Sequence, residues 1–318
     1  MIKSFSNPWE NMVLGTRRRV EFDTKHDYFW IVSCEHTYGF YMKLLIDNSD
    51  IELDDRLKGI DIIINRMNDN NIELCLKLDS EEDWEIFYVL CKDLITTVDS
   101  YECDVDKLIK LKNRLKKWRN LLANKGRLSM SIEKQMGLFS ELYCLSNIIA
   151  AKKGYEVAID SWVGIDKDKQ DFNLDTMALE VKSHRVSKGN YANISSVGQL
   201  YTEKDKLYLV SYGLTISDIG QTIDDLYNNI VEKVDELYAE CLKMKLFDTG
   251  WITNFSEQKK EHFIVDTEKI YYVDELFPKI NRDSIDSIIN EVKYKIDLSR
   301  CKKYIKSVDE VFCGERYD

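Results

Sequence analysis

One stretch of the sequence decides the fold, and it reads Asp171-Phe172-Asn173-Leu174-Asp175-Thr176-Met177-Ala178-Leu179-Glu180-Val181-Lys182. Two short apolar runs flank a turn-like Asn-Leu-Asp-Thr segment, a pattern that predicts a β-hairpin. Successive side chains on a strand point to opposite faces, so Glu180 and Lys182 share one face of the second strand and Val181 lies on the other. The hairpin also brings Asp171, on the first strand, close to this pair.

Two carboxylates and a lysine held together are the groups that a Mg²⁺-dependent phosphodiester hydrolase needs. Carboxylate oxygens bind the hard cation, while the ammonium group orients or activates water and balances charge on the phosphate. The residues before the hairpin include three other acids, Asp160, Asp166 and Asp168. We rank Asp166 and Asp168 below Asp171 because they fall in a loop that no strand fixes. The hairpin therefore predicts a metal-dependent hydrolytic site.

Five segments resemble the PD-(D/E)XK nuclease superfamily, which has the restriction-endonuclease-like fold: residues 137–142, 162–164, 171–172, 179–182 and 194–200. They are most similar to a prokaryotic branch of that superfamily associated with phage-defence and restriction loci. The resemblance covers roughly the C-terminal two-thirds of the chain. The chain departs from the pattern at Gln170, where proline precedes the aspartate in the motif, and at Ser140, where we expect glycine. Neither departure removes a metal ligand.

The resemblance implies a role for each motif residue. Asp171 and Glu180 would ligate one or two Mg²⁺ ions, for which Mn²⁺ would substitute, and the main-chain carbonyl of Val181 would be a further ligand. Lys182 would position or activate the attacking water. Glu141, on the preceding helix, would orient a metal or a metal-bound water.

A helix is predicted over residues 132–152, with Ser131 as its N-cap. On a helical wheel Glu141 falls between Leu145 and Ile148, within the apolar sector. A buried carboxylate is costly unless it is paired or bound to metal, so Glu141 forms either a salt bridge to a core cation or part of the metal site. The resemblance favours the metal site.

Gln199 is a further candidate catalytic residue, on a short helix that Asn193 or Ser195 would cap. It resembles a helix glutamine that supports the active site in several branches of the superfamily. The alternative is an ordinary surface amide, and the sequence leaves both open.

Two groups of basic residues are candidates for binding DNA. Residues 107–127 contain nine Lys and Arg and no Asp or Glu, in a chain with a net charge of −11. A helix over 105–123 would pack through an apolar stripe and expose a row of cations on its flank: Lys107, Lys110, Arg114 and Lys117. Such a row is either a solvated surface or a phosphate-contacting face. After the hairpin come His184, Arg185 and Lys188, of which His184 continues the alternation of Glu180 and Lys182; the alternative for His184 is a partly exposed strand end.

The chain is long enough for two domains. We expect a β-rich N-terminal domain at 1–100, a basic helix and linker at 101–130, and a nuclease-like domain at 131–318. Strands are predicted near 17–22, 28–32 and 40–45, a hairpin at 60–64 and 72–76 across 68–71, and a helix from a Ser80 cap to 97. In the C-terminal part, strands are predicted at 155–163, 207–212 and 292–298, and a helix at 222–246. The fold class is therefore α/β: a restriction-endonuclease-like mixed sheet flanked by helices, with an N-terminal β-rich α+β domain.

Composition narrows the class of protein. No apolar run approaches the length of a membrane span and the N-terminus lacks a signal-peptide core, so we expect a cytoplasmic protein. The eight cysteines are scattered, without the close pairs of a structural zinc site, and we expect them to be reduced.

The sequence thus predicts a Mg²⁺-dependent endonuclease of restriction type that cuts double-stranded DNA, in phage defence. The alternative is a catalytically inactive member that binds DNA or a partner in a defence complex. An RNA nuclease is disfavoured only by family habit. From the resemblance alone we expect a homodimer, and a methyltransferase or ATPase as partner.

Overall fold

The computed structural model describes residues 7–21, 24–45, 56–66, 71–99, 104–123, 130–163, 170–255, 258–281, 285–286 and 288–313. The chain divides into two compact units, Met1–Leu128 and Ser129–Asp318. Among the described residues, no helix combines the length and apolarity needed to cross a bilayer. The described cysteines are all free thiols, and Cys91, Cys144 and Cys301 are buried. Cys103 lies outside the described residues.

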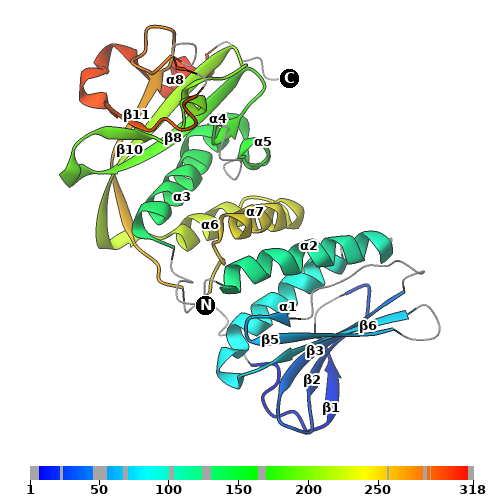
Figure 1. Cartoon of the computed structure of the whole chain (residues 1–318). Helices are drawn as coiled ribbons and strands as arrows, with labels where there is room; N and C mark the ends of the chain where they lie inside the picture. Colours follow the sequence, from blue (N-terminus) through cyan, green and yellow to red (C-terminus); the bar gives the residue numbers. More distant parts are fainter. Residues whose placement is uncertain are drawn as a thin grey trace. The chain divides into compact units, whose positions relative to one another are not determined.

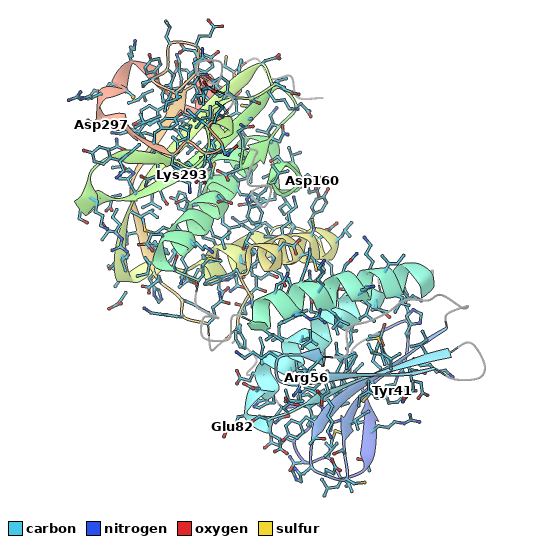
Figure 2. The ribbon with its side chains drawn as sticks, viewed as in Figure 1. Tyr41, Arg56, Glu82, Asp160, Lys293 and Asp297 are labelled. Atoms are coloured by element: carbon cyan, nitrogen blue, oxygen red, sulfur yellow. The ribbon has the colours of Figure 1, made fainter. Side chains whose placement is uncertain are left out.

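The first unit contains an antiparallel sheet with strand order β1-β2-β3-β6-β5-β4. The strands are β1 (Thr16–Arg19), β2 (Tyr28–Val32), β3 (Tyr38–Leu45), β4 (Arg56–Leu57), β5 (Ile60–Arg66) and β6 (Asn71–Leu78). Alternation along β2, β3 and β6 buries one face of the sheet, with Trp30, Phe40 and Leu76 fully enclosed. At the edge strand β4, Arg56 pairs with Asp61 at 3.2 Å and Asp79 at 3.1 Å (Figure 2). The predicted hairpin is confirmed as β5 and β6; its turn at 67–70 lies outside the described residues.

Two helices cover the buried face of this sheet, α1 (Trp84–Asp99) and α2 (Asp104–Ala123) (Figure 1). The predicted apolar stripe of α2 is confirmed, because Leu108, Leu111, Leu115, Trp118 and Leu122 are all buried. The basic helix that the sequence set apart at 101–130 thus packs within the first unit; residues 124–129 are not described. Ser80 makes no side-chain cap: a short 3₁₀ turn (Glu81–Asp83) precedes α1 instead. The predicted Ser80 cap is therefore wrong.

The second unit is built on a mixed sheet with strand order β13-β11-β10-β8-β7. Its strands are β7 (Phe172–Asn173), β8 (Met177–Arg185), β10 (Lys206–Gln221), β11 (Phe263–Tyr272) and β13 (Ile305–Lys306). Only β8 and β10 are parallel among these described strands. A separate two-stranded ribbon pairs β9 (Tyr191–Ile194) with β12 (Tyr294–Asp297). The result is the mixed α/β fold expected for a PD-(D/E)XK-like protein.

Helices and the ribbon cover opposite faces of this sheet. On one face, the side chains of Leu179, Val181 and Val210 belong to a large core shared with α3 (Ile132–Cys144), α5 (Tyr155–Ser161), α6 (Ile223–Val231), α7 (Glu236–Thr249) and α8 (Val308–Phe312). On the other face, Ala178 and Leu209 pack in a smaller core with the β9–β12 ribbon. Ser131 caps α3 as predicted, and the helix continues through a π-helical turn (Leu145–Ile149) into α4 (Ala150–Lys153).

Three predicted elements differ from the structure. Residues 155–163 are not a core strand but the helix α5, which buries Ala158, Ile159 and Trp162 at helical spacing; only Trp162 forms a β-bridge, to Phe172. The helix predicted over 222–246 is split into α6 and α7, because Asp235 starts a new helix by capping the N–H of Tyr238. The late strand exists as β12 but pairs with β9, outside the main sheet.

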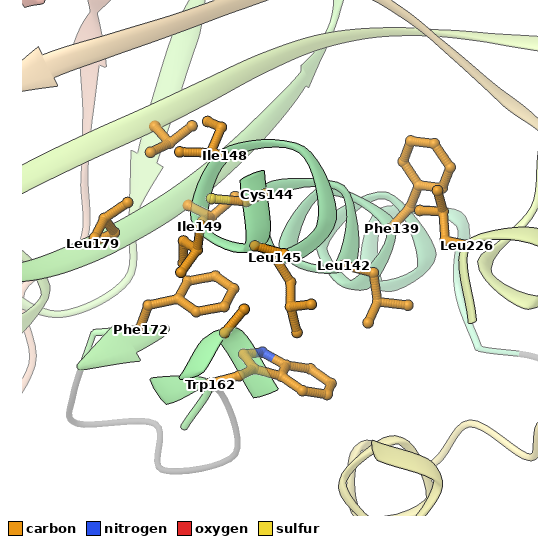
Figure 3. Close-up of a cluster of buried hydrophobic side chains, with 14 of the residues drawn as sticks. Phe139, Leu142, Cys144, Leu145, Ile148, Ile149, Trp162, Phe172, Leu179 and Leu226 are labelled. Atoms are coloured by element: carbon orange, nitrogen blue, oxygen red, sulfur yellow. The ribbon is translucent and has the colours of Figure 1, made fainter. Parts of the chain in front are cut away.

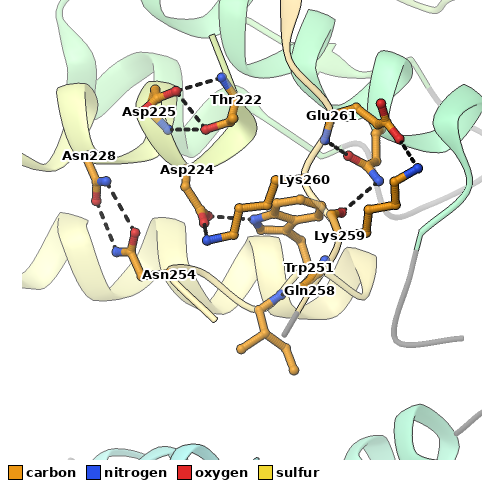
Figure 4. Close-up of polar contacts among 12 residues, drawn as sticks. Thr222, Asp224, Asp225, Asn228, Trp251, Asn254, Gln258, Lys259, Lys260 and Glu261 are labelled. Atoms are coloured by element: carbon orange, nitrogen blue, oxygen red, sulfur yellow. Dashed lines mark hydrogen bonds and ion pairs between the residues drawn. The ribbon is translucent and has the colours of Figure 1, made fainter. Parts of the chain in front are cut away.

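A polar cluster fastens the segment after α7 to the start of α6 (Figure 4). Thr222 and Asp225 form the predicted capping box. Asp224 is buried and accepts a hydrogen bond from Trp251 Nε1 at 2.9 Å and an ion pair from Lys260 at 2.7 Å. Because both partners of the buried carboxylate come from residues 251–260, this segment is held against α6.

Candidate active site

The β7–β8 hairpin brings together the predicted motif. Phe172 pairs with Leu179 across the two strands, and the N–H of Leu174 donates to the carbonyl of Met177 at 2.9 Å to close the turn. Phe172 and Leu179 are fully buried against the π-helical part of the preceding helix, together with Trp162 (Figure 3). Burying a side chain of this size contributes about 1.5–3 kcal/mol, which anchors the hairpin against α3.

Asp171 is tied to the second strand of the hairpin. Its Oδ2 accepts a hydrogen bond from the backbone N–H of Val181 at 2.7 Å. Val181 was predicted to contribute its carbonyl to a metal; the structure gives its N–H a second task, which is to orient the aspartate. Because Val181 lies between Glu180 and Lys182, this bond brings Asp171 to the two charged residues of the motif.

Glu180 and Lys182 form a buried ion pair. Lys182 Nζ lies 2.6 Å from Glu180 Oε1, with side-chain exposures of 17% and 0%. Within the described residues, neither Glu180 oxygen has a hydrogen-bond partner beyond this pairing. A fully buried carboxylate with so few donors is an expensive arrangement, which is typical of sites that hold a further positive group.

Glu141 reaches the same site from α3. Its Oε2 accepts a hydrogen bond from Trp162 Nε1 at 2.9 Å. The sequence analysis did not consider Trp162 as a partner for Glu141. Burial raises the pKa of Glu141 well above its ordinary value, and the negative charge of Asp171 raises it further. That mutual influence extends to Glu180 and Lys182, so the helix acid, the hairpin acids and the lysine share one electrostatic environment.

The hairpin carboxylates also have raised pKa values. Burial raises the pKa of Asp171 to about 6, although Lys182 and the Val181 N–H oppose the shift. Burial and the neighbouring Asp171 raise the pKa of Glu180 to about 8. Burial alone would lower the pKa of Lys182, but the Glu180 and Asp171 carboxylates outweigh it and raise that pKa. The site therefore holds more acidic groups than its single lysine can neutralise, and a bound cation would relieve the excess.

The donor set fits a hard divalent cation in its chemistry, because it consists of carboxylate oxygens and two of them, on Glu180, lack hydrogen-bond donors. Its present geometry is not that of a closed metal cage. Within the described part of the chain, no three His, Cys, Asp or Glu side chains are grouped closely enough to hold a metal. Lys182 occupies Glu180 Oε1.

Gln199 is nearly buried, so its alternative as a surface amide is wrong. Its Oε1 accepts hydrogen bonds from the backbone N–H of Ser195 at 2.9 Å and from Ser195 Oγ at 3.1 Å. It lies on a short 3₁₀ helix (Val197–Leu200), for which neither Asn193 nor Ser195 is the N-cap; Ser196 holds that position without a side-chain bond. The printed contacts of Gln199 therefore shape this turn, and its catalytic role stays a prediction.

Gln170 has a positioning role that the sequence did not reveal. Its Nε2 donates to the carbonyl of Gly198 at 3.0 Å and to that of Tyr201 at 2.5 Å. The residue that replaces the motif proline thus fastens the start of β7 to the turn that contains Gln199. A buried amide with several carbonyl acceptors holds the backbone just before Asp171, as a proline would by its ring.

The basic helix gives a mixed result. Lys110 and Lys117 are exposed, but Lys107 and Arg114 are buried, with 2% and 3% of their surface accessible. Arg114 Nε donates to Asp93 Oδ2 at 2.6 Å, and Trp118 Nε1 donates to the same oxygen at 2.7 Å. The prediction of one exposed row is wrong for Lys107 and Arg114, because the helix turns them toward the core and, for Arg114, toward Asp93 on α1.

The other candidates lie near or away from the hairpin. His184, Arg185 and Lys188 line one pocket beside the C-terminal end of β8. Asp160, on α5, accepts a hydrogen bond from Tyr238 at 3.2 Å and lies on the exposed surface. Asp166 and Asp168 are outside the described residues.

The mixed sheet, the hairpin and its acid, acid and lysine motif define a PD-(D/E)XK-like protein. A family model described as "Putative PD-(D/E)XK family member, (DUF4420)" matches residues 5–299, and the chain belongs to this family. The matched range includes the first unit, which the predicted resemblance had left out. The comparisons with curated proteins and with solved structures gave no significant match.

Proposed function

We propose that this protein is a metal-dependent endonuclease that hydrolyses phosphodiester bonds of DNA. One observation carries the proposal: Asp171, Glu180 and Lys182 meet on one hairpin, with Glu141 in the same electrostatic environment. Membership of a PD-(D/E)XK family supports a nuclease. The excess of buried acids over cations supports a divalent ion, and Mg²⁺, replaceable by Mn²⁺, suits an all-oxygen donor set.

The roles of the residues follow from their surroundings. Asp171 and Glu180 would hold the cation, with the Val181 carbonyl as a further ligand and Glu141 behind them. When bound, the cation would stabilise negative charge on the phosphate and lower the pKa of water. The raised pKa of Lys182 keeps this side chain protonated at neutral pH. It therefore acts as a positive charge that positions water and balances the phosphate, not as a general base.

Finer assignments belong to the same proposal. Restriction-type cleavage of double-stranded DNA, a role in phage defence, a homodimer and a methyltransferase or ATPase partner are all supported by the family resemblance. The basic side chains at the end of β8 and the exposed lysines of α2 support DNA as the substrate.

A second function is favoured by one observation, the Lys182–Glu180 contact together with the lack of a closed metal group among the described residues. A catalytically inactive member of the family would bind DNA or a partner through the same surface. Cleavage assays separate the two functions.

The test is incubation of supercoiled plasmid with the full chain in Mg²⁺ or Mn²⁺, with EDTA as a blank. Lys182→Met removes the charge while keeping the length of the side chain. Lys243→Met is the matched control, since Lys243 also pairs with a glutamate, Glu240 at 3.0 Å, but on α7. We expect cleavage by the wild type and the control and a loss of at least about 100-fold in Lys182→Met.

Equal cleavage by all three proteins would assign the activity to a contaminant or another site. Absence of cleavage with either metal, in protein that is folded by circular dichroism, would favour the inactive DNA- or partner-binding function.

A further inference from the structure

A pocket of 320 Å³ opens directly beside the candidate active site. Ser183 and His184, the residues that follow Lys182 on β8, form part of its wall. His184 lies on the same face of the strand as Lys182, about 7 Å further along. The volume lies within the range typical of small-molecule sites. An occupant of this pocket would therefore lie next to the reacting phosphate.

The opposite wall comes from the β9–β12 ribbon, more than a hundred residues later in the sequence for β12. Asn193 pairs directly with Lys295, so both point to the same face, and Tyr191 is two residues from Asn193 on that face. Ala192 and Ile296 point the other way and are buried in the smaller core. The ribbon thus uses its apolar face to attach to the sheet and presents Tyr191, Asn193 and Lys295 to the pocket.

The ring of Tyr191 is held in place by a glycine. Gly189 has a φ of +87°, and a Cβ at this position would lie 2.8 Å from Tyr191 Cε2. Only glycine therefore lets the ring lie against the backbone of the turn. The tyrosine remains 37% exposed, and Lys295 Nζ is 5.3 Å from the centre of its ring. A fixed, partly exposed aromatic ring beside a cation is a surface on which a nucleobase stacks.

The charge of the pocket suits a phosphate. Arg185, Lys188 and Lys295 line it, against one acidic residue among its lining, Glu133. Glu133 lies 3.5 Å from Arg185 and is itself largely exposed. The neighbouring amide of Asn193 has both a donor and an acceptor for the edge of a base. Cations, an aromatic ring and an amide in one concave site are the groups that bind a whole nucleotide.

We propose that this pocket holds one unpaired nucleotide of the substrate strand, with its phosphate against Arg185, Lys188 and Lys295 and its base on Tyr191. The inference rests on the proposed nuclease function for its place in the reaction. It adds a substrate preference, because a concave pocket accepts a base that is out of the duplex stack more readily than a paired one.

Binding can be measured without catalysis, by fluorescence anisotropy of the full chain in EDTA. The probes are a labelled oligothymidine and a blunt duplex of the same length. We expect the single strand to bind tighter. Tyr191→Ala should weaken its binding about tenfold and Tyr191→Phe should preserve it, while duplex binding changes little. Lys295→Ala should also weaken binding. Lys233→Ala is the matched control, since Lys233 lies over Tyr155 at 5.1 Å, away from the pocket.

Wild-type affinity in Tyr191→Ala and Lys295→Ala, or an equal loss in Lys233→Ala, would overturn the inference. So would a blunt duplex that binds as tightly as the single strand. The proposed function fails separately: Tyr191-dependent binding without any metal-dependent cleavage would retain the pocket and remove the nuclease. Cleavage that depends on Lys182 but not on Tyr191 would do the reverse.

Discussion

Asp171 Oδ2 accepts the backbone N–H of Val181 at 2.7 Å, so the acid of the first hairpin strand is bonded to the backbone between Glu180 and Lys182. Two demands meet on this one carboxylate. It must satisfy a backbone donor, and in the proposed function it must also hold a cation.

These two demands can be separated by substitution. Asp171→Asn keeps an oxygen that accepts the Val181 N–H but removes the charge, so we expect stability within about 1 kcal/mol of wild type and no cleavage. Asp171→Ala leaves the donor unsatisfied and should lose about 1–3 kcal/mol of unfolding free energy. Urea denaturation and plasmid cleavage measure the two effects. If Asn and Ala destabilise equally, the hydrogen bond does not orient the residue.

The Lys182–Glu180 pair should couple strongly in stability. Lys182→Met alone leaves a buried carboxylate unpaired, for which we expect a loss of about 3 kcal/mol. Glu180→Gln in the same chain should restore most of that loss, because the site then holds no isolated charge. A double-mutant cycle by denaturation gives the interaction energy. Additive effects would show that the two side chains do not depend on each other.

Divalent cations should stabilise the wild type. A cation that binds only the folded state adds about 2.7 kcal/mol at a concentration 100 times its dissociation constant. We therefore expect the melting temperature to rise with Mn²⁺ and to return to its starting value with EDTA. In Asp171→Asn/Glu180→Gln the rise should vanish. A rise of the same size in this double variant would place the cation elsewhere.

Two histidines should titrate on opposite sides of the ordinary value of 6.5. Burial, and then Lys269, lower the pKa of His184, whereas the hydrogen bond and charge of Glu81 raise the pKa of exposed His36. A lowered histidine pKa means that His184 contributes stability above pH 6.5 that is lost as the pH falls through its folded value. NMR titration, with His184→Gln and His36→Gln for assignment, measures both. The reverse order of the two pKa values would contradict the described burial.

The basic residues of α2 should separate into two groups. Arg114→Ala removes the partner of buried Asp93, and we expect a loss of about 3–5 kcal/mol in stability. Lys110→Glu/Lys117→Glu, at exposed positions, should leave stability almost unchanged, weaken DNA binding and reduce its salt dependence by about one per contact. Binding at several salt concentrations provides the measurement. Unchanged affinity would remove α2 from the DNA-binding surface.

The hairpin could be predicted from sequence because its signals are local. Strand alternation and a polar turn fix which side chains share a face, and Glu180 and Lys182 follow directly. The partners of these residues could not be predicted in the same way. Trp162 bonds to Glu141 and Gln170 bonds to the turn at 198–201 through contacts set by tertiary packing.

The errors have the same origin. Residues 155–163 alternate well enough for a strand, but packing of Ala158 and Ile159 against the π-helical turn favours a helix, and so local pattern gives way to tertiary contacts. Arg114 resembles its exposed neighbours in sequence. Its burial depends on Asp93, twenty-one residues earlier on another helix.

The most direct test of the central claim is a crystal of the full chain soaked with Mn²⁺ and measured for anomalous scattering. The claim predicts a peak between the carboxylates of Asp171 and Glu180, with Lys182 displaced from Glu180 Oε1. Strong scattering elsewhere, or none with Lys182 still paired to Glu180, would contradict it.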